Sequence, residues 1–138
     1  MTALYVATAL STGTGREGHV ETSDGKVSLD LDFPKELGGS GAGTNPEQLV
    51  AMGYAACFSS ALGVTARRRK ATLSAVEVTC EVSLLQADGG YALSFEIIAR
   101  LAGVAADEAQ SLVAEAHTVC PYSRAFSHGV ATQARAAV

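Results

Sequence analysis

The segment from Asn45 to about Arg69 limits the possible folds of this chain more than any other. Asn45 is a good N-cap, Pro46 suits the first helical position, and Gln48 can complete a capping box. The helix that they predict is apolar on nearly every side, and such a helix has to be buried all round. The remaining segments must therefore cover it.

Short alternating runs before this helix predict β-strands. Tyr5 to Leu10, His19 to Thr22 and Val27 to Leu31 have the expected patterns. The last two runs are joined by Ser23 to Lys26, whose Asp-Gly pair is a strong hairpin signal. The glycine-rich segment from Leu37 to Gly43 predicts a flexible loop, and it is no phosphate-binding loop because no Gly-Lys-Ser/Thr follows and no strand runs directly into it.

Alternation of polar and apolar residues returns after the helix. Val76 to Leu84 and Tyr91 to Leu101 predict two longer strands, with a turn from Ala87 to Gly90. A second helix is expected from Ala106, and it ends or kinks at Cys120-Pro121, since proline disfavours helical geometry in the preceding residue.

A last edge strand is expected from Val130 to Ala136. The order of strands, helix, strands, helix and strand shows neither a linker nor an internal repeat. It predicts one α+β domain over residues 1–138, which is long enough to bury a core. The apolar fraction of 48% against 17% charged residues indicates tight packing or a sizeable subunit interface.

Charge and hydropathy exclude several kinds of partner. A net charge of −4 argues against nucleic acid and anionic membranes. The segment from Met1 to Leu10 has no features of a targeting sequence. The apolar stretch from Leu49 to Val64 is interrupted by Gly53, Ser59 and Ser60, and is expected to be too short to span a bilayer. We therefore expect a cytoplasmic protein.

Three cysteines in a reducing compartment are each core filler, metal ligand or reactive thiol. Cys80 occupies an inward position of an alternating strand, which is typical of core packing. Cys57 lies inside the apolar helix, and periodicity alone favours packing there too. Cys120 lies at a helix end; if a helix restarts at Pro121, free backbone N–H groups beside Cys120 would lower its pKa, although ordinary burial explains it equally well.

Other uses of these residues stay open at this point. His117 and Cys120 are three apart on one helical face, and His19 or His128 could complete a metal site, but no CxxC or HExxH motif is present. A Cys-His hydrolase with His117 or His128 as base is a second possibility. A redox sensor or small-molecule-binding protein that switches through Cys57 and Cys120 is a third, although a basic DNA-reading face is missing.

A peroxide-reacting cysteine needs a nearby cation. The thiolate is the nucleophile, and apolar burial raises a thiol pKa, so a positive charge must compensate. The helix around Cys57 offers none, whereas Arg16 lies in a turn-prone loop from Gly13 to Gly18 that could fold over a pocket. A buried arginine needs an acidic partner in turn, and Glu47 is a candidate. Composition and spacing alone do not assemble this set.

Three motifs together resemble a known family. Their order, their spacing and the chain length resemble the organic hydroperoxide resistance (Ohr) proteins of the Ohr/OsmC family, over essentially the whole chain. The motifs are Asn45-Pro46-Glu47-Gln48-Leu49 through Gly53-Tyr54-Ala55-Ala56-Cys57-Phe58, then Val119-Cys120-Pro121-Tyr122-Ser123, and Gly15-Arg16-Glu17-Gly18.

The resemblance implies a role for four residues. Cys57 matches the peroxidatic cysteine and Cys120 the resolving one, while Arg16 matches the arginine that stabilises the thiolate and Glu47 the carboxylate that orients this arginine. It also implies an OsmC-like α+β fold with antiparallel sheets around two central helices, in an intertwined homodimer. Family members reduce organic hydroperoxides to alcohols without a bound cofactor or metal, and take electrons from lipoylated proteins.

The chain departs from the family pattern after Ser123. Many members continue with Asn-Ala, whereas this chain continues from Arg124 to His128. The difference falls at the expected pocket rim and at the contact with the reductant. Cys80 matches no family role.

Overall fold

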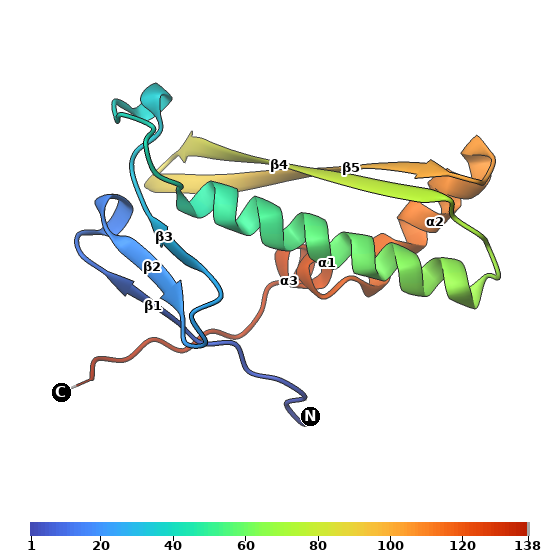
Figure 1. Cartoon of the computed structure of the whole chain (residues 1–138), viewed down its shortest axis with the longest axis horizontal. Helices are drawn as coiled ribbons and strands as arrows, with labels where there is room; N and C mark the ends of the chain where they lie inside the picture. The colour runs from blue at the N-terminus through green and yellow to red at the C-terminus, as the bar shows by residue number, and fades with distance from the viewer. Residues whose placement is uncertain (138) are drawn as a thin grey trace. The chain divides into compact units, whose positions relative to one another are not determined.

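The computed structural model describes residues 1–137, which form two antiparallel sheets and three α-helices (Figure 1). The α+β class predicted from the sequence is confirmed. The chain forms two compact units, Met1–Leu49 and Val50–Val138. The expectation of one domain over residues 1–138 stays a prediction.

The first unit contains a three-stranded sheet in the order β1-β2-β3. The strands are β1 (Ala9–Thr12), β2 (His19–Thr22) and β3 (Ser28–Asp30), and neighbours pair antiparallel. The predicted β2–β3 hairpin is confirmed. The first strand is later than the predicted Tyr5–Leu10, because pairing with β2 begins only at Ala9, opposite Thr22.

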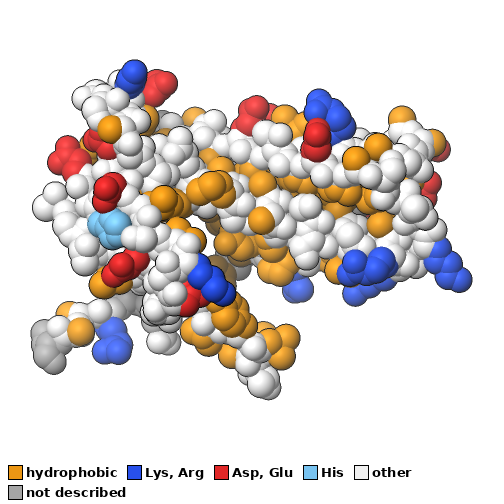
Figure 2. Space-filling model, viewed as in Figure 1, with side chains coloured by type: hydrophobic (Ala, Val, Ile, Leu, Met, Phe, Trp, Pro, Cys, Tyr) orange, Lys and Arg blue, Asp and Glu red, His pale blue; other side chains and the backbone are white. Residues whose placement is uncertain are grey.

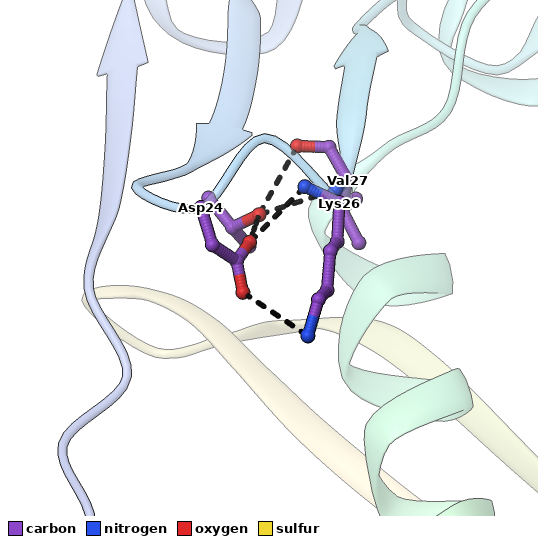
Figure 3. Close-up of polar contacts among 4 residues, drawn as sticks. Asp24, Lys26 and Val27 are labelled. Atoms are coloured by element: carbon purple, nitrogen blue, oxygen red, sulfur yellow. Dashed lines mark hydrogen bonds and ion pairs between the residues drawn. The ribbon is translucent and has the colours of Figure 1, made fainter.

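Side chains close the β2–β3 turn (Figure 3). The Thr22 hydroxyl donates to Asp24 Oδ1 at 2.7 Å, and the Lys26 N–H donates to the same oxygen at 3.0 Å. The Val27 N–H donates to the Thr22 hydroxyl at 3.1 Å. Gly25 has a φ of 73°, which a glycine adopts without strain. These contacts explain why the Asp-Gly signal predicted the hairpin correctly.

Helix α1 (Pro46–Arg68) begins where the sequence predicts. Asn45 Oδ1 accepts the Gln48 N–H at 2.9 Å, as an N-cap should. The reciprocal half of the capping box differs from expectation. Gln48 Oε1 accepts a hydrogen bond from the Thr44 hydroxyl at 2.9 Å, so the Gln48 side chain binds the residue before the cap.

The prediction that α1 is buried on all sides is wrong within this chain. Met52, Ala56 and Ser60 recur every fourth residue and form an exposed stripe, with Met52 56% exposed. The opposite side is buried through Tyr54, Phe58, Ala61, Leu62, Thr65 and Ala66. Only one side of the helix therefore meets the core formed by this chain.

The apolar stretch was expected to be too short to span a bilayer, but the helix that contains it is longer than that stretch. Helix α1 has 23 residues and is apolar enough that, by length and composition alone, it is a candidate membrane span. Core helices of globular domains share these properties. The buried side of α1 packs in the core of the second unit.

The second unit contains a long two-stranded ribbon, β4 (Ala75–Ala87) and β5 (Gly90–Ala102). The strands pair antiparallel from Ala75 opposite Ala102 to Ala87 opposite Gly90, which confirms the predicted hairpin. From Val50 on, α1 runs along this ribbon (Figure 1), and one ribbon face packs against the core. The fully buried side chains of the core include Phe58, Leu62 and Leu112.

Two helices complete the unit, α2 (Ala106–Val119) and α3 (Pro121–His128). The predicted break between them is confirmed: Cys120 has a φ of −63° and a ψ of 124°, and Pro121 starts the next helix. The edge strand predicted from Val130 to Ala136 is wrong. A strand needs a neighbour to pair with, and residues 129–137 pair with no strand of residues 1–137 and are exposed.

Candidate active site

Two thiols meet in the second unit. Cys57 is half-buried on α1, and Cys120 is fully buried at the junction of α2 and α3. The Cys120 Sγ lies 3.6 Å from the Cys57 Sγ, and both cysteines are free. A disulfide needs a sulfur–sulfur distance of about 2.05 Å. The two sulfurs are thus within a small movement of a covalent bond.

The surroundings of Cys57 shift its pKa in opposite directions. Burial raises the pKa of the Cys57 thiol, and the neighbouring Cys120 adds to this, whereas a hydrogen bond from the Tyr122 backbone N–H lowers it. Tyr122 is the second residue of α3, so its N–H is one of the donors that a helix start leaves without an intrahelical partner. Hydrogen bonding at this N-terminus thus favours the thiolate of Cys57.

This donor was not foreseen from the sequence. The sequence suggested that free N–H groups at the start of a helix from Pro121 could act on Cys120, which is the N-cap residue of that helix, with ordinary burial as the alternative. The Cys120 side chain is directed toward Cys57, and the helix start lies beside both sulfurs. The signal for a helix start was present in Pro121, but which thiol the N–H reaches depends on how α3 packs against α1.

Arg16 and Glu47 form an ion pair in the first unit. Arg16 lies on the short 3₁₀ helix η1 (Gly15–Glu17), and Glu47 lies in the first turn of α1. Both guanidinium-to-carboxylate hydrogen bonds measure 2.5 Å, and the side chains are 25% and 16% exposed. The hydrogen bond from Arg16 lowers the pKa of Glu47, and the same bond raises the pKa of Arg16. The charge partner expected for Arg16 is present.

The structure therefore assembles the four predicted site residues as two pairs. The thiol pair belongs to the unit Val50–Val138, and the ion pair to the unit Met1–Leu49. The approach of Arg16 to Cys57 stays a prediction, and so do the catalytic roles of all four residues.

An aromatic cavity lies in the same unit as the thiols. Its volume is about 190 Å³, and the Tyr54 ring meets Phe58 and Phe95 edge-on there. Phe95 also stacks on Phe126, with ring centroids 4.3 Å apart. The cavity is lined by Tyr54, Phe58, Phe95, Ile97, Val113 and His117. An apolar group would fit this lining.

The histidines have partners other than a metal site. His19 contacts Asp30 and Ser28, and His117 Nδ1 lies 3.0 Å from the Ser123 hydroxyl. His128 Nδ1 lies 3.2 Å from the Arg124 carbonyl. Across residues 1–137, no three His, Cys, Asp or Glu side chains converge as metal ligands would. These contacts favour the ordinary, hydrogen-bonded role for each ring.

Cys80 behaves as expected for a packing residue. It lies on β4, is half-buried and packs against the core cluster. Burial raises the pKa of its thiol. Unlike Cys57, it has neither a second thiol nor a backbone N–H as hydrogen-bond partner among residues 1–137.

Comparison with known proteins identifies the family. The family model for OsmC-like proteins matches residues 38–135. The organic hydroperoxide resistance protein of Xanthomonas axonopodis pv. citri is 45% identical over 124 residues, covering 88% of this chain and 87% of that protein. OhrA of Bacillus subtilis is 46% identical over 134 residues, covering 92% of both.

A solved structure agrees with these relatives. The organic hydroperoxide resistance protein from Legionella pneumophila superposes with a TM-score of 0.87 at 50% identity, covering 93% of both chains. The match extends to the fold, the sequence and nearly the whole length of each chain. The chain therefore belongs to the OsmC-like family and, within it, to the organic hydroperoxide resistance (Ohr) proteins, as its motifs predict.

Proposed function

We propose that this protein is a thiol peroxidase that reduces organic hydroperoxides to alcohols through a Cys57 sulfenic acid and a Cys57–Cys120 disulfide. The observation that carries the proposal is the 3.6 Å contact between two free thiols, beside a backbone N–H that favours the Cys57 thiolate. The names of the relatives, organic hydroperoxide resistance proteins, support the substrate class.

In the first step the Cys57 thiolate attacks the terminal oxygen of the hydroperoxide. The O–O bond breaks, the alkoxide takes up a proton and leaves as an alcohol, and Cys57 becomes a sulfenic acid. Burial raises the Cys57 pKa, so this step needs compensation. We assign that role to the Tyr122 N–H and to Arg16, which Glu47 holds by its fork of hydrogen bonds.

In the second step Cys120 resolves the sulfenic acid. The Cys120 thiol gives up its proton and attacks the Cys57 sulfur, the S–O bond breaks, and water leaves. The short distance between the sulfurs supports this step. The disulfide that results stores the two oxidising equivalents of the peroxide.

In the third step an external dithiol reduces the disulfide by thiol–disulfide exchange and supplies two electrons. The family resemblance proposes a lipoylated protein as this reductant. The cycle uses only protein sulfur and the external dithiol, and so we propose no bound cofactor and no metal.

The apolar surroundings favour an alkyl hydroperoxide over hydrogen peroxide. Tyr54 and Phe58 flank Cys57 on α1 and line the aromatic cavity. An alkyl or fatty-acid chain loses contact with water when it packs against such side chains, whereas hydrogen peroxide gains nothing from them. We therefore propose that the protein distinguishes organic hydroperoxides from hydrogen peroxide by binding their alkyl part.

We also propose that the protein is a homodimer in the cytoplasm. The exposed stripe of α1 from Met52 to Ser60 is the part of a mostly apolar helix that this chain leaves uncovered. Figure 2 shows hydrophobic side chains along α1 and the adjoining ribbon. A second copy that covers this stripe would complete its burial. Sedimentation of wild type and Met52→Asp tests this, with a shift of the variant to monomer as the expected result.

A steady-state assay tests the peroxidase proposal. Wild type should turn over cumene hydroperoxide repeatedly with dihydrolipoamide, and more efficiently than hydrogen peroxide. Cys57→Ser should be inactive, and Cys120→Ser should consume about one equivalent and stop as a sulfenic acid. Cys80→Ser is the matched control and should keep its activity. Multiple turnovers by Cys57→Ser, or a single turnover by wild type as expected of a redox sensor, would overturn the proposal.

A further inference from the structure

A buried hydroxyl joins the helices that carry the two thiols. The Tyr54 hydroxyl lies 2.8 Å from the Ser123 Oγ, and His117 Nδ1 lies 3.0 Å from the same oxygen. Ser123 is fully buried and Tyr54 is 3% exposed. Three side chains from three helices thus meet at one hydroxyl group: Tyr54 from α1, His117 from α2 and Ser123 from α3.

The positions of these residues relate to the cysteines in a regular way. Tyr54 precedes Cys57 by three residues on α1, so the two side chains occupy neighbouring positions on one helix face. His117, on α2, is three residues before Cys120, and Ser123, on α3, is three residues after it. The Ser123 hydroxyl therefore links the helix before Cys120, the helix after it and the helix of Cys57.

The hydrogen bonds can be satisfied in either form of the histidine. When Nδ1 is an acceptor, Tyr54 donates to Ser123 and Ser123 donates to His117. When Nδ1 carries a proton, His117 donates to Ser123 and Ser123 donates to Tyr54. A hydroxyl serves both arrangements because it carries one donor and two acceptor sites, and an alanine at this position would serve neither.

Cys120 depends on such a link more than Cys57 does. Cys57 lies within the 23-residue helix α1, whose own backbone hydrogen bonds fix its position. Cys120 joins two helices in extended geometry: its N–H donates to the Ala116 carbonyl at 2.9 Å and its carbonyl accepts the Arg124 N–H at 3.0 Å, so its position depends on how α2 and α3 are held against each other. Its sulfur must also travel from 3.6 Å to about 2.05 Å from the Cys57 sulfur for a disulfide to form.

We propose that Ser123 is a positioning residue for the resolving step: its hydroxyl, held between Tyr54 and His117, keeps the Cys120 sulfur within attack distance of Cys57. The inference rests on the proposed peroxidase cycle. The step concerned converts the Cys57 sulfenic acid and the Cys120 thiol into a disulfide and water, and the peroxide has already been reduced when it begins.

Single-turnover kinetics separate the two steps. Reduced protein is mixed with one equivalent of cumene hydroperoxide, sulfenic acid is trapped with dimedone at timed intervals, and free thiols are counted after denaturation. Ser123→Ala should slow disulfide formation at least tenfold and leave sulfenic acid formation within threefold of wild type. Ser127→Ala removes an exposed hydroxyl from the same helix and should match wild type in both steps.

A double-mutant cycle tests whether the three side chains act together. Tyr54→Phe keeps the ring and loses one hydrogen bond to Ser123, so it should slow resolution by a smaller factor. Tyr54→Phe combined with Ser123→Ala should be no slower than Ser123→Ala alone, because the alanine has already removed the shared partner. If Ser123→Ala does not fold, Tyr54→Phe decides alone; because Tyr54 also lines the aromatic cavity, its resolution rate is compared with its own rate of sulfenic acid formation, and a fall in this ratio is the expected result.

The outcomes separate this inference from the proposed function. Unchanged resolution in a folded Ser123→Ala or Tyr54→Phe variant, or an equal slowing of both steps, would overturn the positioning role while wild type still cycles. A wild-type protein that forms no sulfenic acid and no disulfide would instead refute the peroxidase proposal. Accumulation of sulfenic acid in Ser123→Ala, with normal peroxide consumption, is the result that we expect.

Discussion

Arg16 donates one hydrogen bond to each carboxylate oxygen of Glu47, and both distances are 2.5 Å. The planar guanidinium fork matches the carboxylate, which a lysine ammonium cannot do. Glu47 therefore fixes the orientation of the guanidinium as well as balancing its charge.

Replacing Arg16 with alanine should raise the Cys57 pKa. In the proposed mechanism the charge of Arg16 favours the thiolate, so its removal should favour the neutral thiol, and burial already raises the pKa in the same direction. The rate of thiol alkylation at pH 7 should fall by roughly tenfold or more, and its pH profile should move to higher pH. Arg100→Ala, which breaks the exposed Arg100–Glu77 pair, is the control. An unchanged profile for Arg16→Ala would place the arginine outside the site.

The ion pair should also make stability depend on pH. Because the pKa of Glu47 is lower in the folded protein, its contribution is present above the unfolded-state pKa and is lost as pH falls through the folded-state pKa. Glu47→Gln should therefore be less stable than wild type by about 1 kcal/mol near neutral pH. Urea unfolding at a series of acidic pH values should show this difference shrinking; a constant difference would contradict the prediction.

Gly53→Ala should perturb the site without weakening the fold. A Cβ at this position would lie 2.9 Å from the Tyr122 hydroxyl and 3.3 Å from its ring, so the ring must move. Helix propensity meanwhile favours alanine by about 1 kcal/mol. Because the Tyr122 backbone supplies the N–H to Cys57, we expect a slower peroxide reaction at unreduced thermal stability.

Gly63→Ala is the matched control for that variant on the same helix. Its Cβ would meet only the end of the Arg67 side chain, at 3.7 Å. It should gain the same stability from helix propensity, about 1 kcal/mol, and react with peroxide at the wild-type rate. Equal rates for both variants would show that the Tyr122 ring position does not matter.

Cys80→Ser should affect stability alone. The side chain packs against the core, and exchanging a thiol for a more polar hydroxyl there should cost about 1 kcal/mol. Chemical unfolding measures this loss, and peroxidase turnover should stay at the wild-type level. A strong loss of turnover in the folded variant would reveal a role for this thiol that its surroundings do not suggest.

Local signals in the sequence predicted the elements well where the residues involved are neighbours in the chain. Asn45 and Pro46 located the start of α1, Asp24 and Gly25 located the hairpin, and Pro121 located the break after α2. Each signal acts through backbone geometry or a hydrogen bond that spans a few residues. Such interactions can be read without knowing the fold.

Interactions between distant segments could not be foreseen in the same way. The Tyr54–Ser123 bond joins residues 69 apart, and the Tyr122 N–H reaches Cys57 only because α3 packs against α1. The exposed stripe at Met52 was missed because an apolar helix does not show whether its own chain covers it. Family resemblance located the thiol pair, whereas periodicity alone favoured core packing for Cys57.

The break at Cys120 has a consequence for the chemistry as a whole. Pro121 has no N–H and restricts the residue before it, so the two helices on either side cannot merge into one continuous rod. An uninterrupted helix would turn each successive side chain by a fixed angle and would leave no choice in where residue 120 points. The proline ring thus separates α2 from α3. This interruption lets the Cys120 sulfur, at the end of α2, face the Cys57 sulfur in the middle of α1.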